Sequence, residues 1–155
     1  MRLSRSQALR FFRLFYSLLD YVNEKHGVLG EPFDPMNDDL RGEQVGELSD
    51  FIFEDHRDVI DAFIRENPSG LDAADLGQVA RWKEALSGSF TIVEHGPHGS
   101  VFMGDHRLFN VQGISQDISD MVRDVPTPVS TVLLPFDGCI VYGVSIARYP
   151  VGLGP

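Results

Sequence analysis

The stretch Val129 to Tyr149 reads VSTVLLPFDGCIVYGVSIARY, and it decides the architecture of the C-terminal half of the chain. Two β-branched, apolar runs flank Asp137-Gly138, a dipeptide that suits the positive φ angles of a tight hairpin turn. We therefore predict strands over 129–136 and 140–146. A type I turn with a bulge at Gly138 would shift the register by one residue. A two-residue turn makes these residues neighbours: Phe136 and Cys139, Leu134 and Val141, Val132 and Gly143 on one face, and Leu133 and Tyr142, Thr131 and Val144, Val129 and Ile146 on the other.

Both faces of this hairpin are apolar, which is typical of strands that are covered on both sides. Pro135 interrupts the first run and has no backbone N–H to donate. In the two-residue register, residues 135 and 140 form a non-hydrogen-bonded pair, so the hairpin itself loses no bond there. Because proline is confined to edges and uncovered strand ends, we predict that no third strand pairs at residue 135.

A long helix is predicted upstream, from about Ser6 to His26. Ser4 and Gln7 form a capping-box pattern, and Gly27 is a typical stop signal. Apolar side chains recur at helical spacing and cover a wide arc, so this helix should contact two neighbours. The arc consists of Phe11, Phe12, Phe15, Leu18, Leu19 and Val22, widened by Leu14 and Tyr21.

The same helix has an unusual charge pattern. Residues 1–19 contain Arg2, Arg5, Arg10 and Arg13 and no acid, although positive charge opposes the dipole at a helix N-terminus. We therefore predict that residues 5–25 form a protein–protein interface, most simply a homodimer, in which these arginines meet the acidic 20–75 segment of a neighbour. The aromatic residues that favour an interface are Phe11, Phe12, Phe15, Tyr16 and Tyr21.

Two alternatives to this interface stay open. The sheet and the later helices can cover both sides of the helix within one chain. The acid-free stretch also resembles a transit peptide or a membrane-surface helix. Against a membrane role, the apolar face continues to Val22 on an acidic helix end.

Residues 27–42 are rich in Gly, Pro, Asp and Asn, which predicts a solvated loop. Starting at Asp34 or Asn37 does not place the oxygen ligands and the glycine that an EF-hand calcium loop requires. Three shorter helices are predicted after this loop. They cover Gln44 to Phe53, His56 to Asn67, and a segment that Asp72 caps and Gly88 ends, with Leu76, Val79, Lys83 and Leu86 on one stripe.

From Ser89 the hydrophobic period becomes that of strands, over Phe90–His95, Ser100–Met103 and Leu108–Gln112, and Ser115 is the expected cap of one short helix. Helices first and strands second is the α+β pattern. We expect about four N-terminal helices packed on one face of a C-terminal five-stranded, mostly antiparallel, bent sheet. The chain should form a single domain, 1–155, with a helical half (1–87), a β half (88–149) and a flexible tail (150–155).

Composition excludes several classes of protein. The net charge is −10, with sixteen acids against four bases between residues 20 and 75, so the surface would repel nucleic acid. Cys139 is the sole cysteine, which excludes an internal disulfide and a CxxC motif and favours a reducing compartment. We therefore expect a cytoplasmic protein. No apolar run approaches the ~18 residues of a membrane span.

Five potential metal ligands fall around two successive turns of the β region: Glu94, His95, His98, Asp105 and His106. Such side chains bind zinc and other divalent cations. Their spacing matches no named motif, and polar residues are common in turns, so ordinary turn residues are the alternative interpretation. Apart from this possible divalent metal, no cofactor is predicted.

Other catalytic signals are weak. Cys139 lies in apolar surroundings, which is typical of an inert thiol. The acids around His56 are explained by the first turn of a helix. The chain contains no G-x-G-x-x-G, P-loop, G-x-S-x-G or H-E-x-x-H pattern. A Ser-His-Asp set that only the fold assembles stays open.

The run LLPFDGCIVY, residues 133–142, resembles the closing hairpin of a group of small uncharacterised bacterial proteins that have a helical first half and a β second half. The run FYSLLDYVN, residues 15–23, is similar to their first helix. The resemblance implies a bacterial cytoplasmic protein and carries over no functional residue. We expect a non-catalytic binding or interaction protein; the alternative is a small metal-dependent enzyme that uses the histidine cluster.

Overall fold

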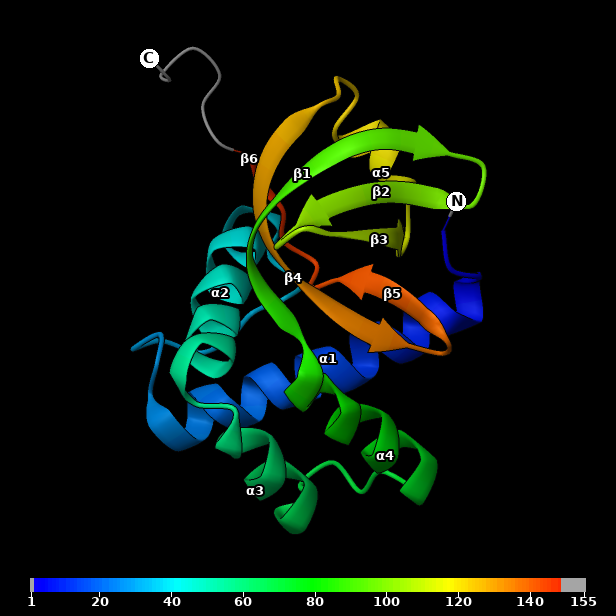
Figure 1. Ribbon diagram of the computed structural model, residues 1–155. Coiled ribbons are helices and arrows are strands. Elements are labelled where there is room, and N and C mark those ends of the chain that lie inside the picture. Colours follow the sequence, from blue (N-terminus) through cyan, green and yellow to red (C-terminus); the bar gives the residue numbers. More distant parts are fainter. Residues whose placement is uncertain (1, 149–155) are drawn as a thin grey trace.

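The computed structural model describes residues 2–148 and has helices in the N-terminal half and strands in the C-terminal half, so the fold class is α+β (Figure 1). The main helices are α1 (Arg5–His26), α2 (Asp38–Asp50), α3 (Asp58–Glu66) and α4 (Ala73–Arg81). A π-helical turn, η1 (Phe51–Asp55), follows α2, and a 3-10 turn, η2 (Trp82–Glu84), follows α4. The tail expected over 150–155 lies outside the described residues.

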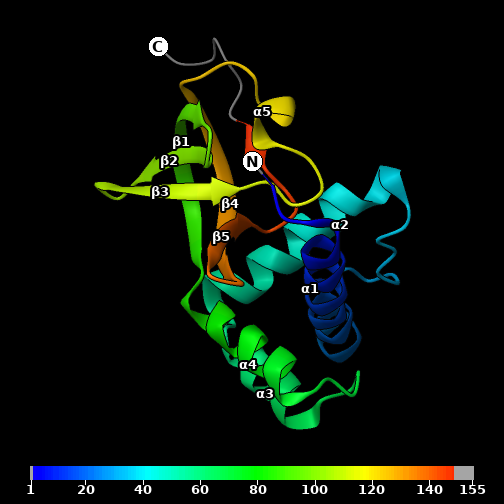
Figure 2. The same cartoon turned by 90° about the vertical axis from the view of Figure 1, so that its right-hand side faces the viewer.

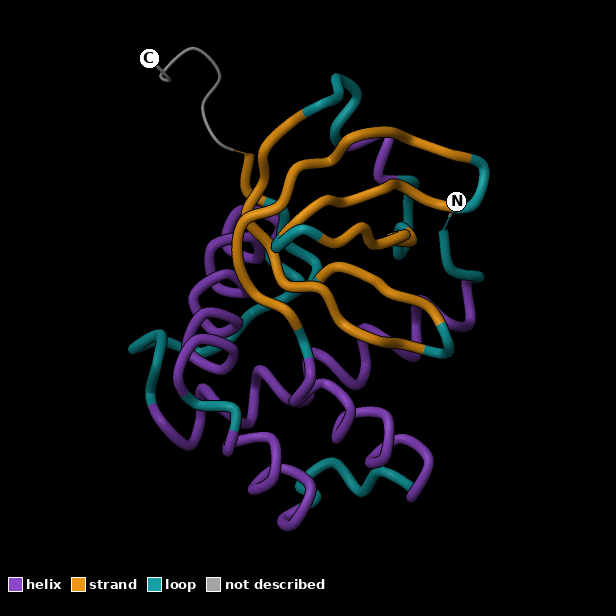
Figure 3. The backbone as a smooth tube through the Cα atoms, viewed as in Figure 1, coloured by secondary structure: helices purple, strands orange, loops and turns teal. Residues whose placement is uncertain are grey.

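The strands form a small closed barrel (Figure 3). They are β1 (Leu86–Gly96), β2 (Gly99–Gly104), β3 (Arg107–Gln112), β4 (Thr127–Phe136), β5 (Cys139–Tyr142) and the short β6 (Ala147–Arg148), and the single turn α5 (Ile118–Met121) lies between β3 and β4. The order is β1-β2-β3-β5-β4, and β1 also pairs with β4, which closes the ring; β6 adds to β4. Strands β3 and β5 run parallel and the other pairs antiparallel. The five expected strands are present, but the expected open sheet is wrong, because the sheet is closed and mixed.

The length of β1 explains the closure. Its first part, from Leu86 to Ile92, pairs with β4, whereas its second part, from Thr91 onward, pairs with β2. Gly88 has a φ of 152°, and a bulge lies between Ile92 and Glu94, so the strand can bend from one neighbour to the other. The predicted strand began at residue 90. It therefore left out residues 86–89, which pair with β4 in the structure.

The β4–β5 hairpin has the predicted register, in which Phe136 pairs with Cys139, and the ladder continues in this register to residue 142. Asp137 and Gly138 have φ values of 49° and 77°, as a two-residue turn with two left-handed positions requires. Residues 131–134 are all buried, so both faces of the strand are covered. This part of the prediction is confirmed.

The predicted register ends at Gly143. Val129 pairs with Arg148 rather than with Ile146, so the second strand has shifted by two residues. Val144 has a φ of 72°, which turns the backbone out of the ladder, and no sequence signal marks that position.

Pro135 pairs with Ile140 and has no strand on its other side, as predicted, because the ladder with β1 ends at Leu133. The Pro135 carbonyl oxygen instead accepts hydrogen bonds from Gln78 Nε2 at 2.8 Å and Trp82 Nε1 at 2.9 Å. The end of β4 that lacks a strand neighbour therefore docks on α4 and η2.

Helix α1 has the predicted bounds within one residue. The capping box between Ser4 and Gln7 is present, and Gly27 ends the helix in the left-handed conformation with a φ of 61°. The other helices depart from prediction. Helix α2 begins at Asp38 because the Asn37 side chain accepts from the backbone N–H of residue 39, so part of the expected loop is helical.

Two further helix boundaries were wrong. Helix α4 ends at Arg81, so Leu86 belongs to β1 and not to the stripe of a helix that runs to residue 88. The cap position of α5 is Asp117 rather than Ser115. Both errors lie at helix ends, where short 3-10 and irregular turns leave little pattern in the sequence.

An aromatic cluster joins the helical half to the barrel. Phe11 of α1 lies 5.3 Å from Phe136 of the hairpin and 5.6 Å from Trp82 of η2, between ring centroids. Phe15 lies 5.6 Å from the same Trp82. Figure 2 shows α1 and α2 beside the barrel and α3 and α4 below it, near the β4–β5 hairpin. The hydrophobic core is thus continuous between the two halves.

Candidate functional site

Arg10 and Arg13 of α1 have partners within the chain. Arg10 Nε lies 2.8 Å from Asp75 Oδ1, Arg10 Nη1 lies 2.8 Å from Asp137 Oδ1, and Arg13 Nη2 lies 2.9 Å from Asp75 Oδ2. The Arg10 guanidinium also lies over the Phe136 ring, 5.3 Å from its centroid. We expected these arginines to meet acids of a neighbouring subunit, but Arg10 and Arg13 instead join α1 to α4 and to the hairpin turn of the same chain.

The structure reduces the part of α1 that is accessible for the predicted interface. Phe11 and Phe15 are fully buried within the chain, so this side of the helix is not free. Leu9 is 60% exposed, and Phe12 and Tyr16 are half-buried. A homodimer through residues 5–25 stays a prediction, and this strip of three residues is where it would form.

The five predicted metal ligands lie at two ends of one strand. Glu94, His95 and His98 lie at the end of β1 and in the turn before β2, whereas Asp105 and His106 form the turn after β2. Strands rise about 3.3 Å per residue, so the two turns lie about 20 Å apart. Within residues 2–148, no three His, Cys, Asp or Glu side chains lie together as a metal site requires. Nearness in sequence was misleading, because successive hairpin turns fall on opposite ends of the strand that joins them.

His95 has contacts at both ring nitrogens. Nδ1 lies 2.7 Å from Ser100 Oγ, and Nε2 lies 2.6 Å from the Val122 carbonyl oxygen. Because a carbonyl can only accept, Nε2 donates to it and Nδ1 accepts from the Ser100 hydroxyl. His95 therefore ties β1 to β2 and to the end of α5.

The other residues considered for catalysis also have structural surroundings. Cys139 is half-buried at the start of β5. The His56 ring stacks on Phe51 at 4.0 Å between centroids, and its Nδ1 lies 3.0 Å from the Phe51 carbonyl oxygen. Neither residue lines the main hollow of the described chain.

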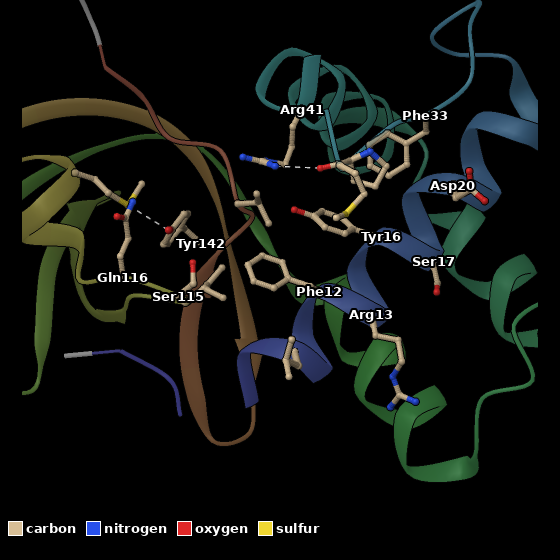
Figure 4. Close-up of a pocket in the computed structure, with 16 residues that line it drawn as sticks. Phe12, Arg13, Tyr16, Ser17, Asp20, Phe33, Arg41, Ser115, Gln116 and Tyr142 are labelled. Carbon is tan, nitrogen blue, oxygen red and sulfur yellow. Dashed lines mark hydrogen bonds between the residues drawn. The ribbon is translucent and has the colours of Figure 1, made fainter. Parts of the chain in front are cut away.

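That hollow is an open groove between α1, the 27–37 loop, the start of α2, the 113–121 segment and the end of β5 (Figure 4). We call it the aromatic groove, after the four rings of Phe12, Tyr16, Phe33 and Tyr142 that line it. Its volume is about 880 Å³. Small-molecule sites typically have volumes of about 300–1,000 Å³, so the groove is of suitable size for a small ligand.

Three of the rings form a continuous wall. Phe12 and Tyr16 are four residues apart on α1, so they share a helix face, and they stack at 5.5 Å with 25° between their planes. Phe33 meets Tyr16 edge-on at 5.8 Å. Such a wall offers broad apolar surface with a polar hydroxyl at one point.

Two buried amides hold the 27–37 loop against this wall. Asn23 donates from Nδ2 to the Glu31 carbonyl at 2.8 Å and accepts from the Leu29 N–H at 2.9 Å. Gln44 accepts from the Asp34 N–H at 2.8 Å and donates from Nε2 to the Pro32 carbonyl at 3.2 Å. The two amide residues are 7% and 3% exposed. The loop is solvated, as its composition predicted, since none of residues 27–37 is fully buried, and the two amides also fix it as a wall of the groove.

The opposite wall depends on a tight turn at Gly113. The Leu3 N–H donates to the Gly113 carbonyl at 2.9 Å, which ties the chain before α1 to this turn. A Cβ atom on Gly113 would lie 2.0 Å from the Gln116 carbonyl oxygen, so no other residue fits this backbone. The turn sets the position of Ile114 and Gln116 in the groove lining.

Two tyrosine hydroxyls face the groove. Burial raises the pKa of Tyr142 to about 12, and the nearby Tyr16 raises it further. The Tyr142 hydroxyl donates to Met121 Sδ at 3.2 Å. Burial also raises the pKa of Tyr16, although Arg41 acts in the opposite direction. Both hydroxyls are therefore protonated at neutral pH. Among residues 2–148, the Tyr16 hydroxyl has no hydrogen-bond partner, and it points into the groove on the side of Arg41 and Tyr142 (Figure 4).

Arg41 is the cation on this side of the groove. Its Nη1 donates to the Pro35 carbonyl at 3.1 Å and lies 2.9 Å from Asp38 Oδ1. The Asp38 side chain is 84% exposed, so solvent screens this ion pair. Nε and Nη2 of Arg41 have no partner within the described chain.

No protein-family model, no curated protein and no solved structure matches this chain. The resemblance of the hairpin therefore assigns no family, and the function has to be argued from the groove. In the described part of the chain, none of the helices has the length and apolar character that crossing a bilayer requires.

Sequence reasoning found one side of the groove and missed the rest. It named Phe12 and Tyr16 among five aromatic residues of α1 that favour an interface, but it did not select Phe33, Arg41 or Tyr142. The available signal was Phe33, a large apolar residue between prolines in a stretch that otherwise looks solvated. Tyr142 gave no separate signal because it continues an apolar strand.

Proposed function

We propose that this chain is a cytoplasmic, non-catalytic binding protein and that the aromatic groove is its ligand site. One observation carries the proposal: four rings from three separate segments surround one hollow, and buried amides hold a wall of it in place. A site that is already formed costs less conformational entropy on binding. The sole cysteine supports the compartment, and the resemblance of the hairpin supports a bacterial origin.

The chemistry of the groove favours binding over catalysis. Among the described lining residues there is no histidine or cysteine, and Asp20 is the one carboxylate. Proton transfer and nucleophilic attack need an activated base or nucleophile within hydrogen-bond reach of the substrate. The alternative of a metal-dependent enzyme has less support, because its candidate ligands lie at opposite ends of β2.

The test is binding of a neutral apolar fluorophore, N-phenyl-1-naphthylamine, whose emission rises in apolar surroundings. The wild-type chain should bind it at one saturable site. Ser115→Phe, which fills the groove from an exposed lining position, should lower the affinity at least about tenfold, because burying the probe is the main source of affinity.

Ser69→Phe is the matched control, since Ser69 is also exposed and lies outside the groove lining. It should bind the fluorophore as the wild type does. Absence of saturable binding to the wild type, or equal binding by both variants, would contradict the proposal.

A further inference from the structure

We infer that the ligand of the aromatic groove is a small organic acid whose flat apolar body lies against Phe12 and Tyr16 and whose carboxylate lies between Arg41 and the Tyr16 hydroxyl. This inference rests on the proposed function and adds the chemical class of the ligand.

The donors for a carboxylate are present and free. Nε and Nη2 of Arg41 have no partner within residues 2–148, and neither has the Tyr16 hydroxyl. Both residues line the groove, and the Tyr16 hydroxyl points to the side on which Arg41 lies (Figure 4). Guanidinium N–H groups and a phenol O–H match the lone pairs of one carboxylate group. These donors lie beside the rings of the groove, and each hydrogen bond that they donate to a carboxylate is charge-assisted.

The surrounding charges favour an acid with one negative charge. Asp38 lies 2.9 Å from Arg41, and Asp20 lines the same groove. The whole chain has a net charge of −10. One carboxylate is balanced by the guanidinium, whereas a second negative charge, as on a phosphate monoester, would meet uncompensated acids.

The wall of the groove favours a flat apolar body. Phe12 and Tyr16 present stacked rings, and Phe33 stands across one end of them. Met121 lies against the Tyr142 hydroxyl on the other side, and its flexible thioether adapts to the outline of a ring. An aromatic acid would therefore stack on the wall while its charge stays at the Arg41 end.

The experiment compares three probes with the same naphthyl body by isothermal titration calorimetry of the wild-type chain. Naphthalene-2-acetate has one negative charge, naphthalene-2-acetamide has none, and 2-naphthyl phosphate has up to two. The acetate should bind about tenfold or more tighter than the amide, because only the carboxylate receives charge-assisted hydrogen bonds. The phosphate should bind more weakly than the acetate.

Variants locate the carboxylate. Arg41→Gln should reduce the preference for the acetate over the amide to about one, and Tyr16→Phe, which keeps the ring, should reduce it about threefold or more. Arg5→Gln is the matched control, because Arg5 lines the neighbouring hollow and has the same charge. It should leave the preference unchanged. Melting temperatures show whether each variant is folded.

Equal binding of acetate and amide by the wild type would overturn the inference that the ligand is an acid, while the proposal that the groove binds an apolar ligand would stand. A phosphate that binds more tightly than the acetate would overturn the single charge. Loss of the preference in Arg5→Gln with retention in Arg41→Gln would place the carboxylate elsewhere and overturn the assignment. If none of the three naphthyl probes binds, the proposed function falls as well.

Discussion

Asp75 is a charged residue that is only 6% exposed, and three segments of the chain meet around it. It accepts from Arg10 and Arg13 of α1, and Arg10 continues to Asp137 at the hairpin turn. Its position in the first turn of α4 also places its charge where the helix dipole is favourable. A carboxylate in this position orients α1 and the hairpin relative to α4.

Replacing Asp75 with asparagine should lower the free energy of unfolding by about 1–3 kcal/mol, because Arg10 and Arg13 lose a partly buried partner. Urea denaturation measures this change. The control is Asp61→Asn, which removes an exposed ion pair with Lys83 and should cost less than about 1 kcal/mol. Equal losses in both variants would show that burial of Asp75 adds nothing.

Tyr142 makes stability depend on pH in the alkaline range. An unfolded tyrosine ionises near pH 10, whereas burial raises the pKa of folded Tyr142 to about 12. The stabilisation is fully present below about pH 10 and is lost as the pH rises through about 12, because only the unfolded state releases its proton between these values. As the pH rises through this window, the free energy of unfolding should therefore fall less steeply for Tyr142→Phe than for the wild type.

Urea denaturation at pH 9, 10 and 11 gives both slopes. The difference between the two proteins should be constant below about pH 9.5, where neither state ionises Tyr142 appreciably, and should change above it. Parallel curves up to pH 11 would contradict the raised pKa.

At the scale of elements, the sequence pattern predicted the features that depend on residues close together in the chain. The Asp137-Gly138 turn sets its own φ angles, so the register around Phe136 and Cys139 could be predicted from the sequence. Closure of the barrel could not, because it depends on β1 pairing with β4 and β3 with β5, which lie far apart in the chain. No periodicity within one strand contains that information.

The candidate site was less predictable than the fold, for the same reason. Its residues come from α1, the 27–37 loop, α2, the 113–121 segment and β5, which lie far apart in the sequence and which only the fold brings together. Asn23 and Gln44, which position the loop, look in the sequence like ordinary polar residues of helices. Their role depends on carbonyl and N–H groups that only the folded loop brings within reach.

Gln44→Ala should loosen the 27–37 loop while it leaves the barrel intact. The N–H of Asp34 and a loop carbonyl lose their partner, so amide hydrogen exchange across residues 29–34 should accelerate about tenfold or more. Affinity for N-phenyl-1-naphthylamine should fall with it. Exchange in β4 should stay as in the wild type.

Glu43→Ala is the control, because Glu43 is the exposed neighbour of Gln44 on the same helix. It should leave the loop protected. Equal exchange of residues 29–34 in both variants would mean that the Gln44 amide does not hold the wall.

At the scale of the whole molecule, the predicted homodimer would use the strip of Leu9, Phe12 and Tyr16, since the rest of the apolar arc of α1 is covered. These three residues also line the aromatic groove, so the dimer would form in the ligand-free chain and compete with the ligand. Light scattering at low and moderate salt should then give twice the chain mass of 17.3 kDa, and Leu9→Arg should return it to the monomer value. Salt should have little effect, because Arg10 and Arg13 are paired within the chain. A wild-type mass that stays at the monomer value at micromolar concentration would remove the homodimer.

The contact between Arg10 and Asp137 spans 127 residues of sequence, and Phe11 reaches Phe136 beside it. During synthesis on the ribosome, α1 therefore leaves the exit tunnel long before the hairpin that covers it has been made. A nascent chain that stops before residue 127 carries a helix whose Phe11 side chain can reach Trp82 but lacks the Phe136 ring that covers it in the finished fold. Such a chain is a typical client of chaperones that bind exposed apolar segments. Completion of the shared core then has to wait for the last strands, because the contacts between α1 and the hairpin join residues far apart in the chain.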